Sequence, residues 1–223
     1  MGLFSNHMNS IHVAHHKDTA GSAIVQMPVP EKVYISMSQH IGKPCQPVVA
    51  KGDHVKVGQL IGDVDAFISA PIYSSVSGDV VAIEEARSAL GGIDKYVIIA
   101  ADGKQEPFEG LAVPQCETRD DFIKAVRASG VVGLGGASFP THVKLNPANI
   151  DECDTLIVNG AECEPFITSD HRNMLEHTDD IVSGIKLIMK YLDLKKCYIG
   201  IENNKPDAIA KMRDAVKDIP GAE

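Results

Sequence analysis

The sequence predicts an α+β protein in which an all-β module is followed by an α/β part with a parallel sheet. Two changes of pattern along the 223 residues support this prediction. Short β-type runs separated by turns occupy residues 31–115, and strand patterns alternate with helix patterns over 116–223. With an unperiodic extended arm over 1–30, a chain of this length makes one large or two small domains.

Composition excludes several classes of protein. Thirty acidic residues against 21 basic ones give a net charge of −9, which disfavours binding to nucleic acid and to anionic lipid. The sequence has no apolar run of about 18 residues and no secretory leader, so we expect a cytoplasmic location.

The five cysteines are widely spaced without Cys-x-x-Cys, which favours free thiols over disulfides or a cluster site. Histidines in the arm could bind a metal, but solvated histidines are the commoner case, and we predict no metal site.

The β module has four expected strands, at residues 32–36, 55–61, 80–83 and 96–99. The succession of Lys51-Gly-Asp-His-Val-Lys-Val-Gly-Gln-Leu-Ile-Gly62, Ser69-Ala-Pro71 and Val76-Ser-Gly-Asp-Val-Val81 resembles the biotinyl/lipoyl-like hammerhead, a barrel-sandwich fold. Carrier members of that family need a lysine at the hairpin tip. The equivalent stretch around Phe67 has no lysine between Val57 and Gly78, so we expect a structural module and not a carrier.

The α/β part begins with a predicted helix, capped by Thr118 and ended near Gly130. The patterns then predict a strand at 155–158, a helix at about 172–192, a strand at 196–201 and a helix at about 206–217. This order implies parallel strand pairing. Because the alternation stops directly after a helix, we expect the chain to be part of a longer protein.

Two motifs of this part have the composition of ligand sites. The first is Gly130-Val-Val-Gly133-Leu-Gly135-Gly136-Ala-Ser-Phe139-Pro-Thr-His-Val-Lys144. Its glycines allow backbone N–H groups to approach an anion, and Lys144 could meet a phosphate, although a purely structural glycine turn is equally compatible with the spacing. The pattern is neither the dinucleotide fingerprint nor a Walker loop, because it follows a helix and lacks Gly-Lys-[Ser/Thr].

The second motif is Asn159-Gly-Ala-Glu162-Cys-Glu164-Pro165, directly after a predicted strand. Segments past the carboxyl end of a parallel strand line the ligand crevice of open α/β sheets. If the segment is extended, Glu162 and Glu164 share one face and could hydrogen-bond a ribose or a nicotinamide. Solvated loop carboxylates are the alternative. Asp170-His-Arg172 could equally form the first turn of the next helix.

Together the motifs resemble the FMN- and NADH-binding subunit of respiratory complex I, which shows G-R-G-G-A-G-F-P-T-x-x-K followed by N-A-D-E-x-E-P. Over nearly the whole chain, including the hammerhead and Ser38-Gln-His-Ile-Gly42, the sequence is more similar to the RnfC family of the Rnf electron-transport complex. That family implies a peripheral subunit, on the cytoplasmic face of the membrane, of a ferredoxin:NAD⁺ oxidoreductase that translocates ions. It further implies FMN, NAD(H), the other Rnf subunits as partners and ferredoxin as an indirect partner. The implied chemistry is hydride exchange between nicotinamide and the flavin, and passage of single electrons from the flavin to 4Fe-4S clusters.

The resemblance assigns roles to eight residues and no general base. Gly133, Gly135 and Gly136 would border the FMN. Lys144 would meet its phosphate end, and Asn159 would hydrogen-bond the flavin. Phe139 and Glu164 would contact NADH, and Glu162 would lie beside the flavin edge.

Four positions depart from the complex I pattern. They are Leu134 for Arg, Ser138 for Gly, Leu145 for Trp, and Ala161 for an Asp that contacts FMN there. The family's cluster motifs and the rest of its flavin pocket are expected outside these 223 residues, so we expect this segment alone to be inactive and to bind FMN weakly or not at all. A cobalamin reductase of bacterial microcompartments and a scaffold without redox activity are the alternatives.

Overall fold

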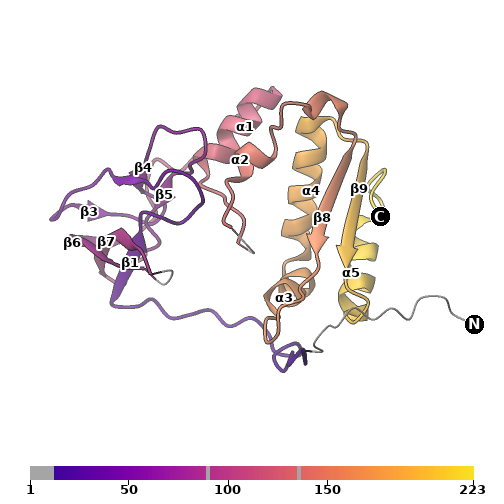
Figure 1. The fold of residues 1–223 in the computed structure, drawn as a ribbon, viewed down its shortest axis with the longest axis horizontal. Helices are drawn as coiled ribbons and strands as arrows, with labels where there is room; N and C mark the ends of the chain where they lie inside the picture. Colours follow the sequence, from indigo (N-terminus) through magenta and orange to yellow (C-terminus); the bar gives the residue numbers. More distant parts are fainter. Residues whose placement is uncertain (1–12, 89–90, 135–136) are drawn as a thin grey trace, which may run out of the picture. The chain divides into compact units, whose positions relative to one another are not determined.

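The computed structural model describes residues 13–88, 91–134 and 137–223 (Figure 1). These residues form two compact units. One is the continuous segment Met27–Glu152, and the other combines residues 13–26 of the arm with Cys153–Glu223. The second unit is therefore built from two stretches that lie far apart in the sequence.

Antiparallel strands build the unit Met27–Glu152. Its larger sheet has four strands, in the order β1 (Lys32–Ser36), β7 (Ile93–Ala101), β6 (Gly78–Arg87) and β3 (His54–Val55). Its smaller sheet has three, in the order β2 (Gln46–Pro47), β4 (Leu60–Asp63) and β5 (Ile72–Tyr73). The four β-type runs are thereby confirmed, except that 55–61 divides into two strands around Gly58, whose φ is +80°. Strands β2 and β5 are too short to leave an alternating pattern in the sequence.

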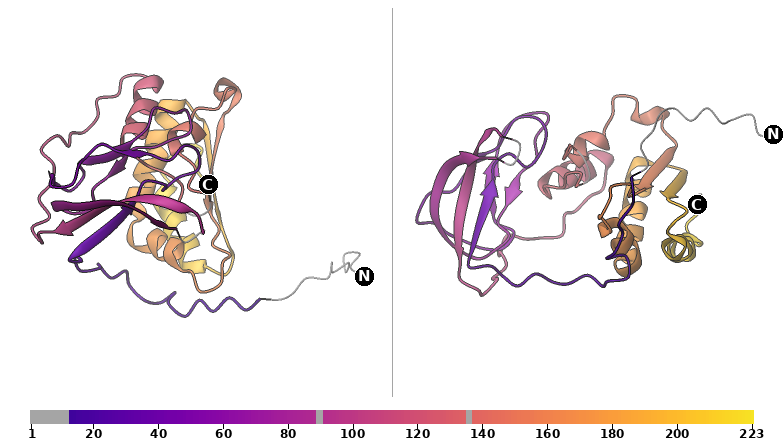
Figure 2. Two further views of the ribbon diagram at one scale, coloured as in Figure 1. Left: turned by 60° about the vertical axis from the view of Figure 1, so that its left-hand side comes forward. Right: turned by 60° about the horizontal axis from the view of Figure 1, so that its bottom comes forward.

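The two sheets share one apolar core, and their strands curl around it (Figure 2). Val97 and Ile99 of β7 are fully buried in it, as are Val55 of β3 and Ile61 of β4. Phe67, at the tip of the segment between β4 and β5, is 80% exposed. The barrel-sandwich class is confirmed by the shared core.

The described residues of this unit also form two helices and one 3-10 turn: α1 (Arg119–Ala128), α2 (Thr141–Lys144) and η1 (Ile150–Glu152). The sequence places the start of the α/β part near residue 116, but α1 packs with the β module. Arg127 donates to the carboxylate of Asp63 over 3.0 Å, and the Tyr73 hydroxyl donates to the carbonyl of Ala128. These contacts explain why residues 116–152 group with the strands that precede them.

The second unit has two strands, β8 (Thr155–Gly160) and β9 (Lys196–Ile201), paired in parallel as predicted. Figure 1 shows both arrowheads at the end where α3 begins. The helices are α3 (Ser169–Glu176), α4 (Thr178–Leu192) and α5 (Pro206–Val216). Met174 of α3 packs with Ala208 and Met212 of α5 to form the centre of this unit's core.

The single helix expected at 172–192 is instead two helices that meet at His177. His177 leaves the helical region, with φ −121° and ψ 34°. Asp179 and Asp180 then lie in the first turn of α4, where a helix N-terminus favours negative charge. Acidic residues in the middle of the expected helix were the signal for this break.

Across the residues that the structure describes, none of the helices combines the length and the apolar character that a bilayer crossing requires.

Candidate functional site

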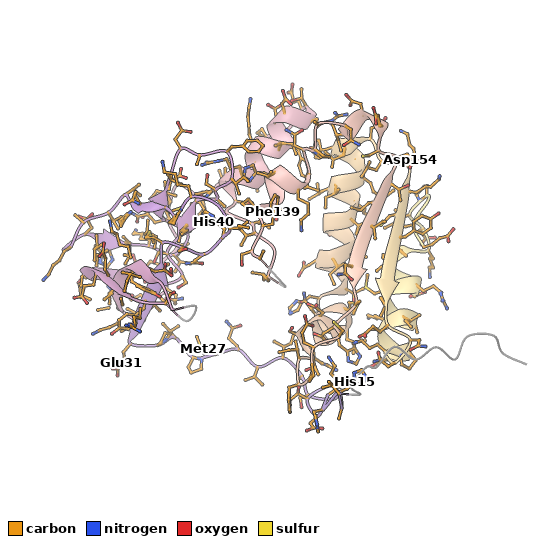
Figure 3. The ribbon with its side chains drawn as sticks, in the orientation of Figure 1. His15, Met27, Glu31, His40, Phe139 and Asp154 are labelled. Atoms are coloured by element: carbon orange, nitrogen blue, oxygen red, sulfur yellow. The ribbon has the colours of Figure 1, made fainter. Side chains whose placement is uncertain are left out.

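The glycine-rich motif forms a closed loop between α1 and α2 in the unit Met27–Glu152. A bridge between Val132 and Pro140 closes it, and the N–H of Gly133 donates to the carbonyl of Phe139 over 3.0 Å. Phe139, labelled in Figure 3, stands just before α2. The predicted flavin-contacting Gly135 and Gly136 lie outside the described residues.

The glycines of this loop differ in whether the fold itself requires a residue without a side chain. Gly130 is required by the fold, because its φ is +69° and a Cβ there would lie 2.6 Å from the carbonyl oxygen of Pro71. Gly133 has no such constraint, since a Cβ would meet its nearest neighbours only at 3.8 Å or more. The chain's own packing therefore explains Gly130 and leaves Gly133 open to a ligand-based explanation.

Ser138 adopts a backbone conformation that favours glycine. Its φ is +51°, in the left-handed region, where a non-glycine residue is strained. The Ser138 carbonyl accepts a hydrogen bond from the N–H of Ile41 over 3.3 Å, which anchors this turn to the β module. The departure from the glycine of the complex I pattern thus keeps the turn at a cost in backbone strain.

Lys144 places a cation beside the loop. It is the last residue of α2 and is exposed, and its Nζ lies 3.9 Å from the position that a Cβ on Gly133 would occupy. An exposed ammonium next to an unobstructed glycine backbone suits an anionic group such as a phosphate. The residues present therefore fit the phosphate end of a flavin nucleotide.

His142 is a feature of this loop region that sequence reasoning missed. It is buried, and its Nδ1 has no hydrogen-bond partner among the described residues. Burial, with the nearby Arg127 and His40, lowers the pKa of its imidazole, so the ring is neutral at physiological pH. Nothing in the spacing of the sequence distinguishes it from an ordinary helix residue.

The second motif follows β8 in the other unit. Asn159 is exposed, and its Oδ1 accepts a hydrogen bond from the N–H of Ala161 over 3.1 Å. Gly160 is tightly packed, because a Cβ there would lie 3.1 Å from the carbonyl oxygen of Gly200 on β9. The end of the strand is therefore fixed, with the Asn159 side chain on its surface.

Glu162 and Glu164 do not share a face, as an extended segment would require. Glu162 is 1% exposed, and its carboxylate accepts hydrogen bonds at the start of α3. The N–H of Asp170 donates to it over 2.6 Å and that of His171 over 3.4 Å. Glu164 is exposed. The chain turns into α3 after β8, and this turn separates the two carboxylates.

Charged groups gather around Glu162. Its backbone N–H donates to the carboxylate of Glu202 over 3.3 Å, and the buried Lys205 forms an ion pair with Glu202. The hydrogen bond from Lys205 lowers the pKa of Glu202. Burial, with the charges of Glu162 and Glu164, raises the pKa of the Asp170 carboxyl. This corner of the unit thus holds several acidic groups that need cations nearby.

A cavity of about 280 Å³ lies at the same corner. Glu162, His171 and Lys205 line it, together with His15 and Lys17 of the arm. His15, labelled in Figure 3, accepts a hydrogen bond from the N–H of Phe166, in the loop that precedes α3. The contribution of the arm is the second feature that sequence reasoning missed, since no local pattern links residue 17 to residue 162.

No group of three or more metal-ligating side chains occurs in the described part of the chain. The glycine loop belongs to one unit and Asn159, Glu162 and Glu164 to the other. Within its own unit, the first motif offers a loop and a cation that suit a phosphate, and the second places polar groups at the carboxyl end of parallel strands.

Two family models match this chain in succession. Residues 6–104 match the RnfC barrel sandwich hybrid domain, and residues 126–223 match the Nuo51 FMN-binding domain. The two matches account for both the β module and the α/β part.

Similar proteins are subunits of ion-translocating complexes. A subunit of the proton-translocating ferredoxin:NAD(+) oxidoreductase complex of Clostridium ljungdahlii is 46% identical over 202 residues, 89% of this chain and 44% of the relative. A subunit of the Na(+)-translocating ferredoxin:NAD(+) oxidoreductase complex of Acetobacterium woodii is 44% identical over 84% of this chain and 43% of the relative. A subunit of the ion-translocating oxidoreductase complex of Rhodobacter capsulatus is 38% identical over 91% of this chain and 40% of the relative. The chain thus spans less than half the length of these relatives.

Proposed function

Because the chain belongs to the RnfC family, we propose that it is the nucleotide-binding segment of the NAD(H)-interacting subunit of a ferredoxin:NAD⁺ oxidoreductase that translocates ions. The observation that carries this proposal is the glycine loop with Lys144 beside Gly133, inside a chain that matches an FMN-binding domain. The ferredoxin:NAD(+) activity in the names of two relatives supports the choice of substrates.

The residues of the two motifs have distinct tasks in this proposal. Gly133 lets the backbone approach the FMN phosphate, and Lys144 balances its charge. Asn159 donates to the flavin from the end of β8, while Phe139 and Glu164 contact the NADH. Glu162 fixes the start of α3 and with it the loop that carries Glu164.

FMN, when bound, exchanges a hydride with nicotinamide and single electrons with iron–sulfur clusters, which we place outside residues 1–223. The protein contributes position and electrostatics and no general base. Its partners are the other Rnf subunits, through which this peripheral subunit attaches to the cytoplasmic face of the membrane. Ferredoxin is an indirect partner that interacts through those subunits.

The test uses the complete gene product, reconstituted with FMN under anaerobic conditions. We expect the visible flavin band to bleach when NADH is added. Lys144→Met should weaken FMN binding about tenfold, because a charge-assisted contact to a phosphate is lost. Lys51→Met, at an exposed lysine of the β module, is the matched control and should leave FMN affinity unchanged.

A well-folded complete protein that neither binds FMN nor responds to NADH would overturn the proposal in favour of a scaffold that retains the fold. Flavin binding with no response to NADH and a response to cobalamin would favour the cobalamin reductase.

A further inference from the structure

The arm reaches the loop after β8 through Lys17. The Lys17 ammonium donates to three backbone carbonyls, over 2.7 Å to Glu162, 2.8 Å to Glu164 and 2.6 Å to Ile167. An ammonium group has three N–H donors, so all of them are used by this one loop.

Further contacts hold the same stretch of the arm in place. The N–H of Phe166 donates to the carbonyl of His15 over 2.9 Å, and the His16 ring stacks on the Phe166 ring with centroids 5.0 Å apart. The hydroxyls of Thr19 and Thr168 are 2.7 Å apart. The arm therefore follows the loop from residue 162 to the start of α3.

The conformation of the loop favours a cation at this point. Three carbonyl oxygens converge on one point, and their partial negative charges repel one another unless a positive group lies between them. Phe166 also has a φ of +69°, a strained value for a non-glycine residue. Lys205 does not serve this purpose, because its ammonium pairs with Glu202.

We propose that Lys17 is a positioning residue of the nucleotide site, which makes the amino-terminal arm a working part of that site. Lys17 fixes the backbone between Glu162 and Ile167 and thereby sets where Glu164 presents its carboxylate to NADH. It acts through the loop, because its three donors are occupied by carbonyls. This inference rests on the proposed function for its nucleotide, and on geometry alone for the loop.

The experiment compares Lys17→Met, Lys17→Arg and the control Lys186→Met in the complete gene product. Lys186 is an exposed lysine of α4 in the same unit. Hydrogen exchange reports on the loop through the Phe166 amide, and we expect it to become at least tenfold faster in Lys17→Met and to stay unchanged in Lys186→Met. For NADH oxidation, we expect KM to rise at least fivefold in Lys17→Met while kcat changes less than twofold.

Lys17→Arg should fall between wild type and Lys17→Met in both measurements, because a planar guanidinium keeps the charge but cannot meet three carbonyls around one point. Unchanged exchange at Phe166 in Lys17→Met would overturn the inference. Faster exchange with an unchanged KM would also overturn it, since Lys17 would then order the loop without affecting the nucleotide. If the wild type itself does not oxidise NADH, the proposed function fails, and the exchange data still decide whether Lys17 holds the loop.

Discussion

The carboxylate of Glu162 makes its hydrogen bonds within the protein. It is buried, and it accepts backbone hydrogen bonds from the first turn of α3. An acidic group at that place satisfies N–H donors that have no partner within the helix and interacts favourably with the helix dipole. Its neighbour Glu164 is exposed. The two carboxylates of one motif therefore have different physical roles.

Glu162→Gln should lower the free energy of unfolding by about 1–2 kcal/mol, because a neutral amide replaces a charged acceptor at a helix start. The matched Glu164→Gln should change it by less than about 0.5 kcal/mol, as is usual for surface substitutions. Urea denaturation followed by circular dichroism measures both values. Equal losses in the two variants would show that the helix cap contributes nothing.

Cys45 is a buried thiol of the β module. It donates to the carbonyl of Ala70 over 3.2 Å. Burial, reinforced by the carboxylate of Asp63, raises the pKa of the Cys45 thiol from 9.0 to about 11. The folded protein therefore keeps this proton over a pH range in which the unfolded chain loses it.

Stability should consequently fall as pH rises from 9.0 to about 11, since the unfolded state binds fewer protons there. Two pKa units correspond to about 2–3 kcal/mol as the largest contribution from this one group. Cys45→Ser removes the titrating thiol, so its stability should decline less steeply over this range than that of the wild type. Parallel pH profiles for the two proteins would contradict the assignment.

At the level of elements, local signals in the sequence predicted the structure where a helix cap or a strand pattern was fully present. Thr118 and Asp121 form a reciprocal capping box at the start of α1, and Gly130 follows its end with a positive φ, as their residue types indicate. The parallel pairing of β8 with β9 is likewise confirmed. The break at His177 was missed because an uninterrupted apolar stripe outweighed the acidic residues in the middle of the pattern.

Gly78 begins β6, and the fold depends on its lack of a side chain. Its φ is +154°, and a Cβ would lie 2.0 Å from the carbonyl oxygen of Ala100 on β7. Gly78→Ala should therefore destabilise the protein by about 3 kcal/mol or more.

The control for this substitution is Gly52→Ala. Gly52 also has a positive φ, of +97°, but open space surrounds its Cβ position, so only backbone strain of about 1–2 kcal/mol is expected. Thermal unfolding of the two variants separates the clash from the strain. Equal losses would show that the Ala100 contact is not limiting.

For the whole molecule, the sequence predicted the two kinds of architecture but not that the arm forms one compact unit with Cys153–Glu223. The change from strand patterns to alternating strand and helix patterns identifies a β module and an α/β part, because these periodicities are local properties of the sequence. The contact of Lys17 with Glu162 spans 145 residues and involves backbone carbonyls, which carry no side-chain identity. No pattern in one sequence encodes such a contact. For the same reason, the sequence did not predict the cavity that the arm and the loop line together.

The arm's distant partner has a consequence for how the protein is made. Residues 13–26 leave the ribosome early, but their loop emerges only after the whole of Met27–Glu152. At synthesis rates of about 5–20 residues per second, roughly seven to thirty seconds pass between the synthesis of Lys17 and that of its acceptors. During that time the β module can fold with the arm unbound. This segment is translated before the β module and is nevertheless among the last to reach its native contacts. A nascent chain stalled before residue 162 would expose it to chaperones and proteases.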